Sequence, residues 1–461
     1  MSIMETSVAP GGAAEVIPLS FQQEFLCLFD KGDEAGPFGP RYTIVGGWRL
    51  SGEIEVNALR GALDDVVVRH EALRTSVVRD AKVLHQRVLP PTSPHLVVVD
   101  LPPIDRGHRD LEAERFLNDI EAGLFSVREQ PLLRAVLGRF DDRDWVLVLV
   151  AHHTAVDGWS IQVILRDLAV CYARRRRLPV PELPEPGQYR DYALWQRANA
   201  DAPAVRRARE FWREKLRGAA VAPIRTDRSR SEGTPFSTAW YRFTLPAQLR
   251  EGVVAVAAEM RSTPFMVLLG AFSVLQHTMT GATDVVVPTF TPGRAQSWTQ
   301  DTVGSFFNLV PLRADLAGCE TFRDVVRRVR ATCLEAYAHE IPFAMVVAEA
   351  PDLMLPALQD RLAPSVFQVA QHPFMMSGER IGDITYAAMR RRTLSQPVGS
   401  DIPDGALWVL ELHGSGEIVG SIGYSTNLIE ENSVRAMVGE FRRVLRSTVT
   451  EPDAPLSHLS P

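Results

Sequence analysis

The chain contains few cysteines and no long apolar run. Its 461 residues include 4 cysteines, Cys27, Cys171, Cys319 and Cys333. Their spacing matches no disulfide framework and no zinc motif, so we expect free thiols in a reducing cytoplasm. No apolar stretch reaches the roughly 18 residues that span a bilayer, and we find no signal peptide. These absences favour a cytoplasmic protein with no membrane partner.

Neither sign of charge dominates the composition. The formal net charge of −6 gives no reason to expect nucleic acid as a partner.

The length is sufficient for two domains. Four prolines within residues 178–187 exclude a helix or a central strand, so we expect a stiff linker there. This linker divides a predicted N-terminal lobe, residues 1–177, from a C-terminal lobe, residues 188–461.

Both predicted lobes mix helical and strand patterns. Continuous apolar runs predict strands, whereas apolar residues spaced by three or four predict helices. Strands are expected at residues 97–99, 145–150 and 285–287, and helices at residues 59–70, 161–172 and 264–277. Ser20 followed by Gln23 suits a capping box at the start of the first helix. The sequence therefore predicts a mixed α/β fold.

Polar side chains gather where the apolar strand at residues 145–150 meets the following helix. His152, His153, Asp157 and Gly158 lie at this junction. Adjacent strand side chains point to opposite faces, so one histidine should face a cleft while the other supports the scaffold. A histidine in a cleft can accept a proton from an alcohol or amine nucleophile. We expect Asp157 to be buried and paired, and Gly158 to let the backbone approach a substrate.

Two simpler interpretations of these residues exist. A histidine beside an apolar run is often a hydrogen-bonded core residue. A metal site built from His153 and Asp157 lacks a third ligand at motif spacing, so we expect no metal.

The motif at residues 152–158 resembles the His-His-x-x-x-Asp-Gly signature of condensation domains from nonribosomal peptide synthetases, within the chloramphenicol acetyltransferase-like superfamily. Other motifs of that family occur in the expected order, at residues 69–75, 189–196 and 303–313. The chain departs from the family pattern at Phe25 and Cys27, where Arg and Trp are usual, and at Ala338, where His is usual. The seventh motif is eroded around residues 360–365.

The resemblance implies two chloramphenicol acetyltransferase-like lobes in a V with an active-site tunnel between them. It further implies a stand-alone enzyme that takes an acyl or aminoacyl group from the phosphopantetheine thioester of a separate carrier protein. The acceptor is an amine or an alcohol, and it is either a small molecule or carrier-bound. The product expected first is an amide, and an ester is the second expectation. No cofactor is expected to reside in the protein. His153 is expected to act as general base or as a positioning acceptor, supported by His152, and the Gly158 N–H is expected to help hold the donor or oxyanion.

The resemblance also suggests partners for these residues. An arginine typically pairs with the signature aspartate, and we expect Arg69 to pair with Asp157, with Arg313 as the next candidate. Trp159 and Asn308 are candidates for lining the tunnel, although a structural role suits Asn308 equally. The loop at residues 291–298 is either a surface loop or part of the tunnel floor.

Two arginine clusters, residues 174–177 and 390–392, are either solvated surfaces or docking patches for an acidic carrier protein. Rival functions are a coenzyme A-dependent alcohol acyltransferase, an inactive platform that recruits partner proteins, and an epimerising relative. A cyclising relative is disfavoured, because Asp would replace the leading histidines.

Overall fold

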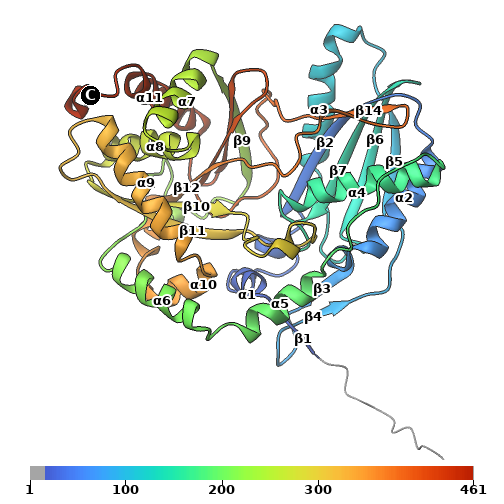
Figure 1. Ribbon diagram of the computed structural model, residues 1–461, viewed down its shortest axis with the longest axis horizontal. Coiled ribbons are helices and arrows are strands. Elements are labelled where there is room, and N and C mark those ends of the chain that lie inside the picture. The colour runs from blue at the N-terminus through green and yellow to red at the C-terminus, as the bar shows by residue number, and fades with distance from the viewer. Residues whose placement is uncertain (1–15, 460–461) are drawn as a thin grey trace, which may run out of the picture.

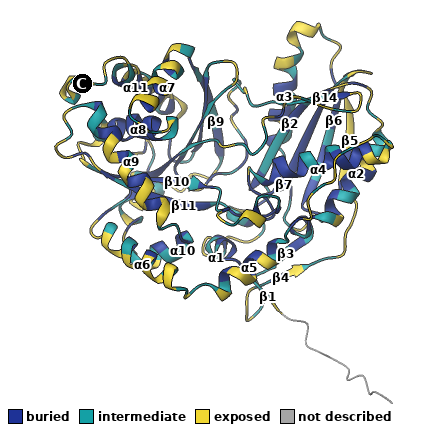
Figure 2. Ribbon diagram, viewed as in Figure 1, coloured by how far each residue is buried: buried dark blue, intermediate teal, exposed yellow. Residues whose placement is uncertain are grey.

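Two β-sheets covered by helices form two lobes that lie side by side (Figure 1). The structure is a computed structural model and describes residues 16–459. Figure 2 shows the buried residues concentrated in the sheets and in the helix faces that cover them. The mixed α/β fold predicted from the sequence is confirmed.

The sheet of the first lobe has six strands within the described chain. In order across the sheet these are β13 (Ser377–Ile381), β14 (Ile384–Ala388), β2 (Thr43–Ser51), β7 (Asp144–His152), β6 (Leu133–Asp141) and β5 (His95–Asp100). The helices of this lobe are α2 (Val56–Arg69), α4 (Ser160–Arg175) and α3 (Arg109–Glu121). On β7, odd-numbered residues from 145 to 151 join the core that contains α2 and α4, and even-numbered residues from 146 to 150 join the core that contains α3. Both faces of β7 are therefore buried, which explains its uninterrupted apolar run.

The second lobe contains a five-stranded sheet and a two-stranded ribbon. The sheet runs β8 (Pro223–Arg225), β12 (Leu362–Val369), β15 (Ala406–Leu412), β16 (Ile418–Ser425) and β9 (Thr238–Leu245), and the ribbon is β10 (Asp284–Thr291) with β11 (Asn308–Asp315). The helices are α6 (Pro203–Lys215), α7 (Ala247–Glu259), α8 (Pro264–Thr280), α9 (Phe322–Ala338), α10 (Phe343–Glu349) and α11 (Glu431–Thr450). Apolar α8 packs centrally because almost its whole surface is hydrophobic, from its Thr263 N-cap to Gly281, whose φ of 74° ends it.

Helices α1 (Phe21–Cys27) and α5 (Tyr189–Ala198) lie at the base between the lobes (Figure 1). A small sheet of β1 (Ile17–Pro18), β4 (His85–Val88) and β3 (Thr75–Val78) accompanies them. The capping box predicted for Ser20 and Gln23 begins α1. The Ser20 hydroxyl also lies 2.8 Å from the Tyr189 hydroxyl, which joins α1 to α5.

The chain crosses between the lobes more than once. Residues 178–188 contain neither helix nor strand. The hairpin β13–β14, however, extends the sheet of the first lobe, where Ala388 pairs with Trp48. Met376 and Ile384 accompany it into the first core because both are apolar. The predicted range 188–461 is therefore not a single lobe, since part of it completes the N-terminal sheet.

Candidate active site

The signature residues occupy the turn between β7 and α4. His152, the last residue of β7, is fully buried. Its Nδ1 lies 2.9 Å from Thr154 Oγ1 and its Nε2 lies 3.1 Å from the Gly39 carbonyl oxygen. Burial is the main cause that lowers the pKa of His152 to about 4. Both ring nitrogens are occupied by the protein, so this side chain braces the turn.

His153 has different surroundings from its neighbour. Its backbone N–H donates to the Tyr42 carbonyl, and its Nδ1 lies 2.7 Å from the Val156 carbonyl oxygen. A carbonyl can only accept, so Nδ1 carries the proton and Nε2 has a free lone pair. The ring stacks on Tyr42 at 4.6 Å and meets Phe307 of the second lobe at 5.3 Å. Burial lowers the pKa of His153, which keeps the imidazole neutral.

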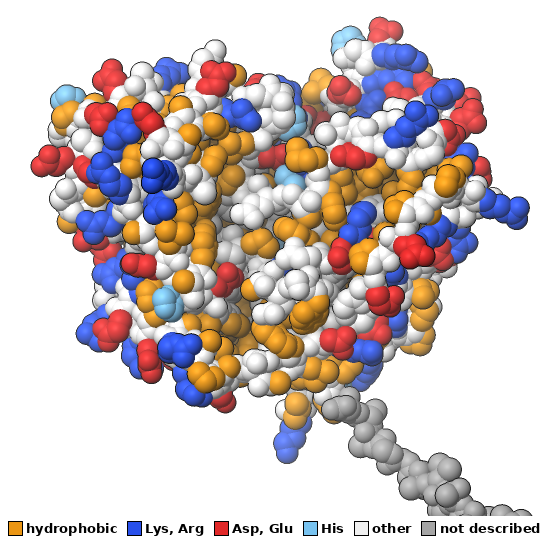
Figure 3. All heavy atoms as spheres, viewed as in Figure 1, with side chains coloured by type: hydrophobic (Ala, Val, Ile, Leu, Met, Phe, Trp, Pro, Cys, Tyr) orange, Lys and Arg blue, Asp and Glu red, His pale blue; other side chains and the backbone are white. Residues whose placement is uncertain are grey.

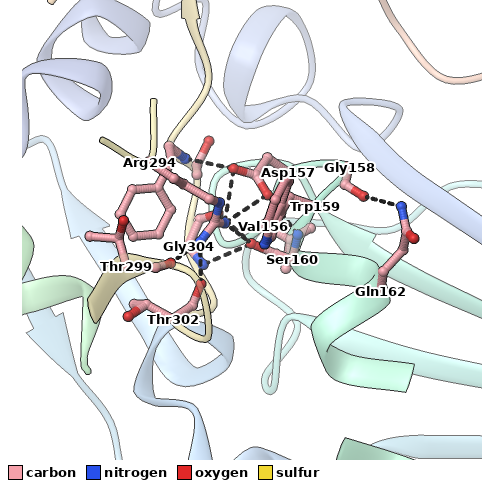
Figure 4. A network of polar contacts seen from close by, with 12 residues as sticks. Val156, Asp157, Gly158, Trp159, Ser160, Gln162, Arg294, Thr299, Thr302 and Gly304 are labelled. Atoms are coloured by element: carbon pink, nitrogen blue, oxygen red, sulfur yellow. Dashed lines mark hydrogen bonds and ion pairs between the residues drawn. The ribbon is translucent and has the colours of Figure 1, made fainter. Parts of the chain in front are cut away.

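Asp157 is buried and makes an ion pair with Arg294 (Figure 4). Arg294 Nη2 lies 3.0 and 3.2 Å from the two carboxylate oxygens and 2.8 Å from Ser160 Oγ. The backbone N–H groups of Ser160 and Phe306 donate to the same carboxylate, at 2.7 and 3.0 Å. The guanidinium lies over the Phe306 ring at 4.0 Å. The charge of Asp157 is therefore matched by a buried cation and two N–H donors.

Arg294 is itself held by the loop that surrounds it. Its Nη1 donates to the carbonyl oxygens of Thr299 and Thr302, at 2.5 and 2.6 Å. Because the loop lies in the second lobe and Asp157 in the first, this pair joins the lobes at the signature.

The predicted pairing of Arg69 with Asp157 is wrong. Arg69 lies at the end of α2, where its Nε is 2.7 Å from Asp167 Oδ2 on α4. Arg313 pairs instead with Asp284 across the ribbon. The true partner, Arg294, is 137 residues from Asp157 in the chain. The only sequence signal for Arg294 was its position in the loop that precedes the motif at residues 303–313.

Gly158 and Trp159 lie at the exposed side of the same turn. A Cβ added to Gly158 would meet nothing within 4 Å, so packing within the protein does not require glycine here. The Trp159 indole N–H donates to the Gln300 carbonyl of the second lobe at 2.9 Å. A tunnel-lining role for Trp159 stays a prediction.

Asn308 acts as a brace at the start of β11. Its amide nitrogen donates to Glu340 and to the Ile341 carbonyl, and its amide oxygen accepts from the Phe343 N–H at 2.9 Å. All of these partners belong to the protein, which favours the structural alternative for Asn308, and a tunnel-lining role stays a prediction.

Most of the two arginine clusters is ion-paired within the protein. Arg175 pairs with Asp65, and Arg176 with Glu55 and Asp383. In the second cluster, Arg391 pairs with Glu417 and Arg392 with the buried Glu121, whereas Arg390 donates to Gln162. In the described part of the chain, only Arg174 and Arg177 of the first cluster are exposed without a carboxylate partner.

Three further features concern metal binding, the reactivity of Cys27 and the hydrophobicity of the helices. Within residues 16–459, no group of three His, Cys, Asp or Glu side chains could hold a metal ion. Burial raises the pKa of the Cys27 thiol to about 11, which keeps it protonated. No single helix of the described chain is long and apolar enough to cross a membrane, although the sharply bent pair α7–α8 meets the length and composition criteria together.

Comparison with known proteins identifies the class. The Condensation domain family model matches residues 13–460, so the chain belongs to the condensation-domain family. It is 34% identical to the nonribosomal peptide synthetase CymA of Salinispora arenicola over 98% of this chain. It is 30% identical to a linear gramicidin synthase of Brevibacillus parabrevis over 96%. The chain spans only 6% of the length of each of these relatives.

Among solved structures, SgcC5 of Streptomyces globisporus is 49% identical, with a TM-score of 0.92 over 95% of this chain and 100% of that one. Its crystal contains (R)-(-)-1-(2-naphthyl)-1,2-ethanediol and sucrose. The X-domain from teicoplanin biosynthesis, at 23% identity and a TM-score of 0.75, shares the fold over 99% of this chain. The chloramphenicol acetyltransferase-like architecture expected from the sequence is thereby confirmed.

Proposed function

We propose that the protein transfers an acyl or aminoacyl group from the phosphopantetheine thioester of a separate carrier protein to a hydroxyl or amine acceptor. One observation carries the proposal: His153 donates Nδ1–H to the Val156 carbonyl where the two lobes meet, and its Nε2 has no hydrogen-bond partner among the described residues. A general base with these properties suits the deprotonation of an alcohol or amine.

The reaction follows from this arrangement. The acceptor oxygen or nitrogen attacks the thioester carbonyl carbon while His153 Nε2 takes its proton. The C–S bond then breaks, the electron pair goes to sulfur, and the imidazolium returns the proton to give the carrier thiol. The open space beside Gly158 suits a bound substrate, and its backbone N–H is our candidate donor to the developing oxyanion. Holding both substrates in place supplies much of the acceleration, because thioesters are already activated.

The acceptor is proposed to be a hydroxyl, so an ester is now the first expectation and an amide the second. The support is the vicinal diol in the SgcC5 structure, a relative that is 49% identical. The choice can be tested with two acceptors that differ only in the nucleophile, 1-phenyl-1,2-ethanediol and 2-amino-1-phenylethanol. Faster product formation with 2-amino-1-phenylethanol would make the amide the expected product and the amine the expected acceptor.

The donor is proposed to arrive on a carrier protein, and Arg174 and Arg177 are the remaining candidates for docking it. Their charge is not neutralised by neighbouring acids in the described chain, unlike that of Arg175 and Arg176. Charge reversal at Arg174 and Arg177 should raise the KM for acyl-carrier in a salt-dependent way, with little change in kcat. Charge reversal at Arg391, which is paired with Glu417, is the matched control.

Intact-mass measurement of carrier discharge tests the whole proposal. The same acyl group is supplied on carrier and on coenzyme A, with the diol as acceptor, and transfer from the carrier should be far faster. Equal rates would favour the coenzyme A-dependent alcohol acyltransferase. Absence of transfer from either donor would favour a recruiting platform, because a fold neighbour, the teicoplanin X-domain, was solved in complex with OxyB.

A further inference from the structure

One peptide unit in the loop before β11 is hydrogen-bonded at both ends. Its N–H belongs to Phe306 and donates to the Asp157 carboxylate at 3.0 Å. Its carbonyl belongs to Ser305 and accepts from the Tyr189 hydroxyl at 2.7 Å. Because a peptide unit is planar, the bond from Tyr189 also fixes the direction in which the Phe306 N–H points. We call the unit of Ser305 and Phe306 the clamped peptide.

The hydrogen bonds that lead to the clamped peptide all run in one direction. The Ser305 carbonyl can only accept, so Tyr189 donates to it, and Ser20 Oγ then donates its hydrogen to Tyr189 at 2.8 Å. Ser20 Oγ in turn accepts from the Gln23 N–H at 3.1 Å, within the cap of α1. Hydrogen bonds aligned in this way polarise one another, so the chain from α1 strengthens the last bond, which ends on Asp157.

Tyr189 packs tightly beside the same loop. A Cβ added to Gly304 would lie 2.0 Å from Tyr189 Cδ2, so glycine is required where the backbone passes the ring. The ring also meets that of Phe306 edge to face, with the centroids 5.0 Å apart. Figure 3 shows that the molecular surface is hollowed between the lobes. Tyr189 is only 3% exposed and contributes almost nothing to any surface, so it acts through its neighbours and not on a substrate.

Two routes lead from the clamped peptide to His153. The first runs through Asp157, because the Val156 carbonyl that accepts His153 Nδ1–H belongs to the peptide unit between Val156 and Asp157. The second runs through Phe307, which follows the clamped peptide and whose ring centroid lies 5.3 Å from that of His153. Rotation of the clamped peptide would therefore release Asp157 and displace the Phe307 ring together.

We infer that Tyr189 is a positioning residue for the transfer reaction, because its hydroxyl orients the clamped peptide and, through it, His153. The inference rests on the proposed function, to which it adds a residue outside the signature. It also gives a role in the reaction to the first residue of the motif at residues 189–196.

Tyr189→Phe tests the inference, because it removes the hydroxyl and keeps the ring that packs beside Gly304. The clamped peptide can then turn away from Asp157, so the Phe306 amide should exchange its hydrogen faster. Hydrogen exchange read by mass spectrometry, with fragmentation to single residues, measures this without any substrate. In addition, kcat should fall by about two- to twelvefold, the worth of one hydrogen bond, while the KM values for acyl-carrier and acceptor stay unchanged.

Tyr192→Phe is the matched control. Tyr192 lies on the same helix and is also buried. Its hydroxyl lies 3.2 and 2.8 Å from the amide nitrogens of Gln22 and Gln196, and no hydrogen bond joins it to the clamped peptide in the described chain. This variant should change neither the exchange of the Phe306 amide nor kcat.

Unchanged exchange of the Phe306 amide in Tyr189→Phe would overturn the inference. Faster exchange with an unchanged kcat would also overturn it, because Tyr189 would then support the fold alone, and so would an equal fall of kcat in Tyr192→Phe. If the parent protein transfers no acyl group, the proposed function fails, and hydrogen exchange still decides whether Tyr189 orients the clamped peptide.

Discussion

The buried pair of Asp157 and Arg294 should hold the signature turn together, and its removal should cost stability before it affects chemistry. In Asp157→Ala, the guanidinium of Arg294 loses its counter-charge in a buried site, which costs about 3–5 kcal/mol. The N–H groups of Ser160 and Phe306, which donate to Asp157 at 2.7 and 3.0 Å, also lose their acceptor. Each buried orphan donor costs about 1–3 kcal/mol, so the total should be about 5 kcal/mol or more.

Arg294→Ala should be milder, because Asp157 keeps both backbone donors. We expect about 3–5 kcal/mol for this change. The double variant should cost less than the sum of the single variants, by up to about 3 kcal/mol, since neither charge is left alone. Arg313→Ala is the control: its pair with Asp284 leaves 25% and 39% of the two side chains exposed, so we expect a loss of about 0.2–1 kcal/mol.

Urea unfolding at neutral pH, followed by circular dichroism, measures these differences. The predicted order of destabilisation is Asp157→Ala first, Arg294→Ala second and Arg313→Ala last. An Asp157→Ala protein that is as stable as the parent but inactive would refute the reasoning, because it would place Asp157 in the reaction itself.

Three further results are expected. His153→Ala should lose about 10²–10⁴-fold in kcat with an unchanged melting temperature. The midpoint of the acid limb of kcat/KM in the parent should lie below pH 6.5, because burial lowers the pKa of His153 below its ordinary value of 6.5. The folded pKa of His152 is about 4, below the unfolded value of 6.5, so its stability contribution should be complete above pH 6.5. As the pH falls from 6.5 toward 4, the free energy of unfolding should decrease by about 3 kcal/mol. Unfolding titrations of His152→Gln across this range should show a weaker dependence of that free energy on pH. Arg69→Ala should lower the melting temperature through loss of its Asp167 contact while kcat changes little, and a large fall in kcat at unchanged stability would contradict this.

The local elements were predictable from the sequence because each has its own periodicity. The apolar run at residues 145–150 lies within β7, and the helical spacing from Ile161 onward lies within α4. The cap at Ser20 was equally predictable, since both of its partners lie within three residues. These features depend on neighbouring residues alone.

The contacts of the site were not predictable in the same way. The sequence offered Arg69 and Arg313 as partners for Asp157, and only the fold shows that Arg294 takes this place. The orientation of α2 against α4 directs Arg69 to Asp167, ten residues beyond the signature aspartate. The rings beside His153 come from the segments that precede β11 and β2, and no local pattern links Phe307 or Tyr42 to the signature.

Several contacts fasten the signature and the start of α4 to the second half of the chain, and two of them come from Asp157 and Gln162. Asp157 binds Arg294, and Gln162 in the first turn of α4 donates to the Gly158 carbonyl and to His372 Nδ1, at 3.3 and 2.8 Å. Arg390 can only donate, and its contact with the Gln162 oxygen therefore fixes the orientation of that amide. Separating the lobes at this seam would break a buried ion pair and this amide bridge together.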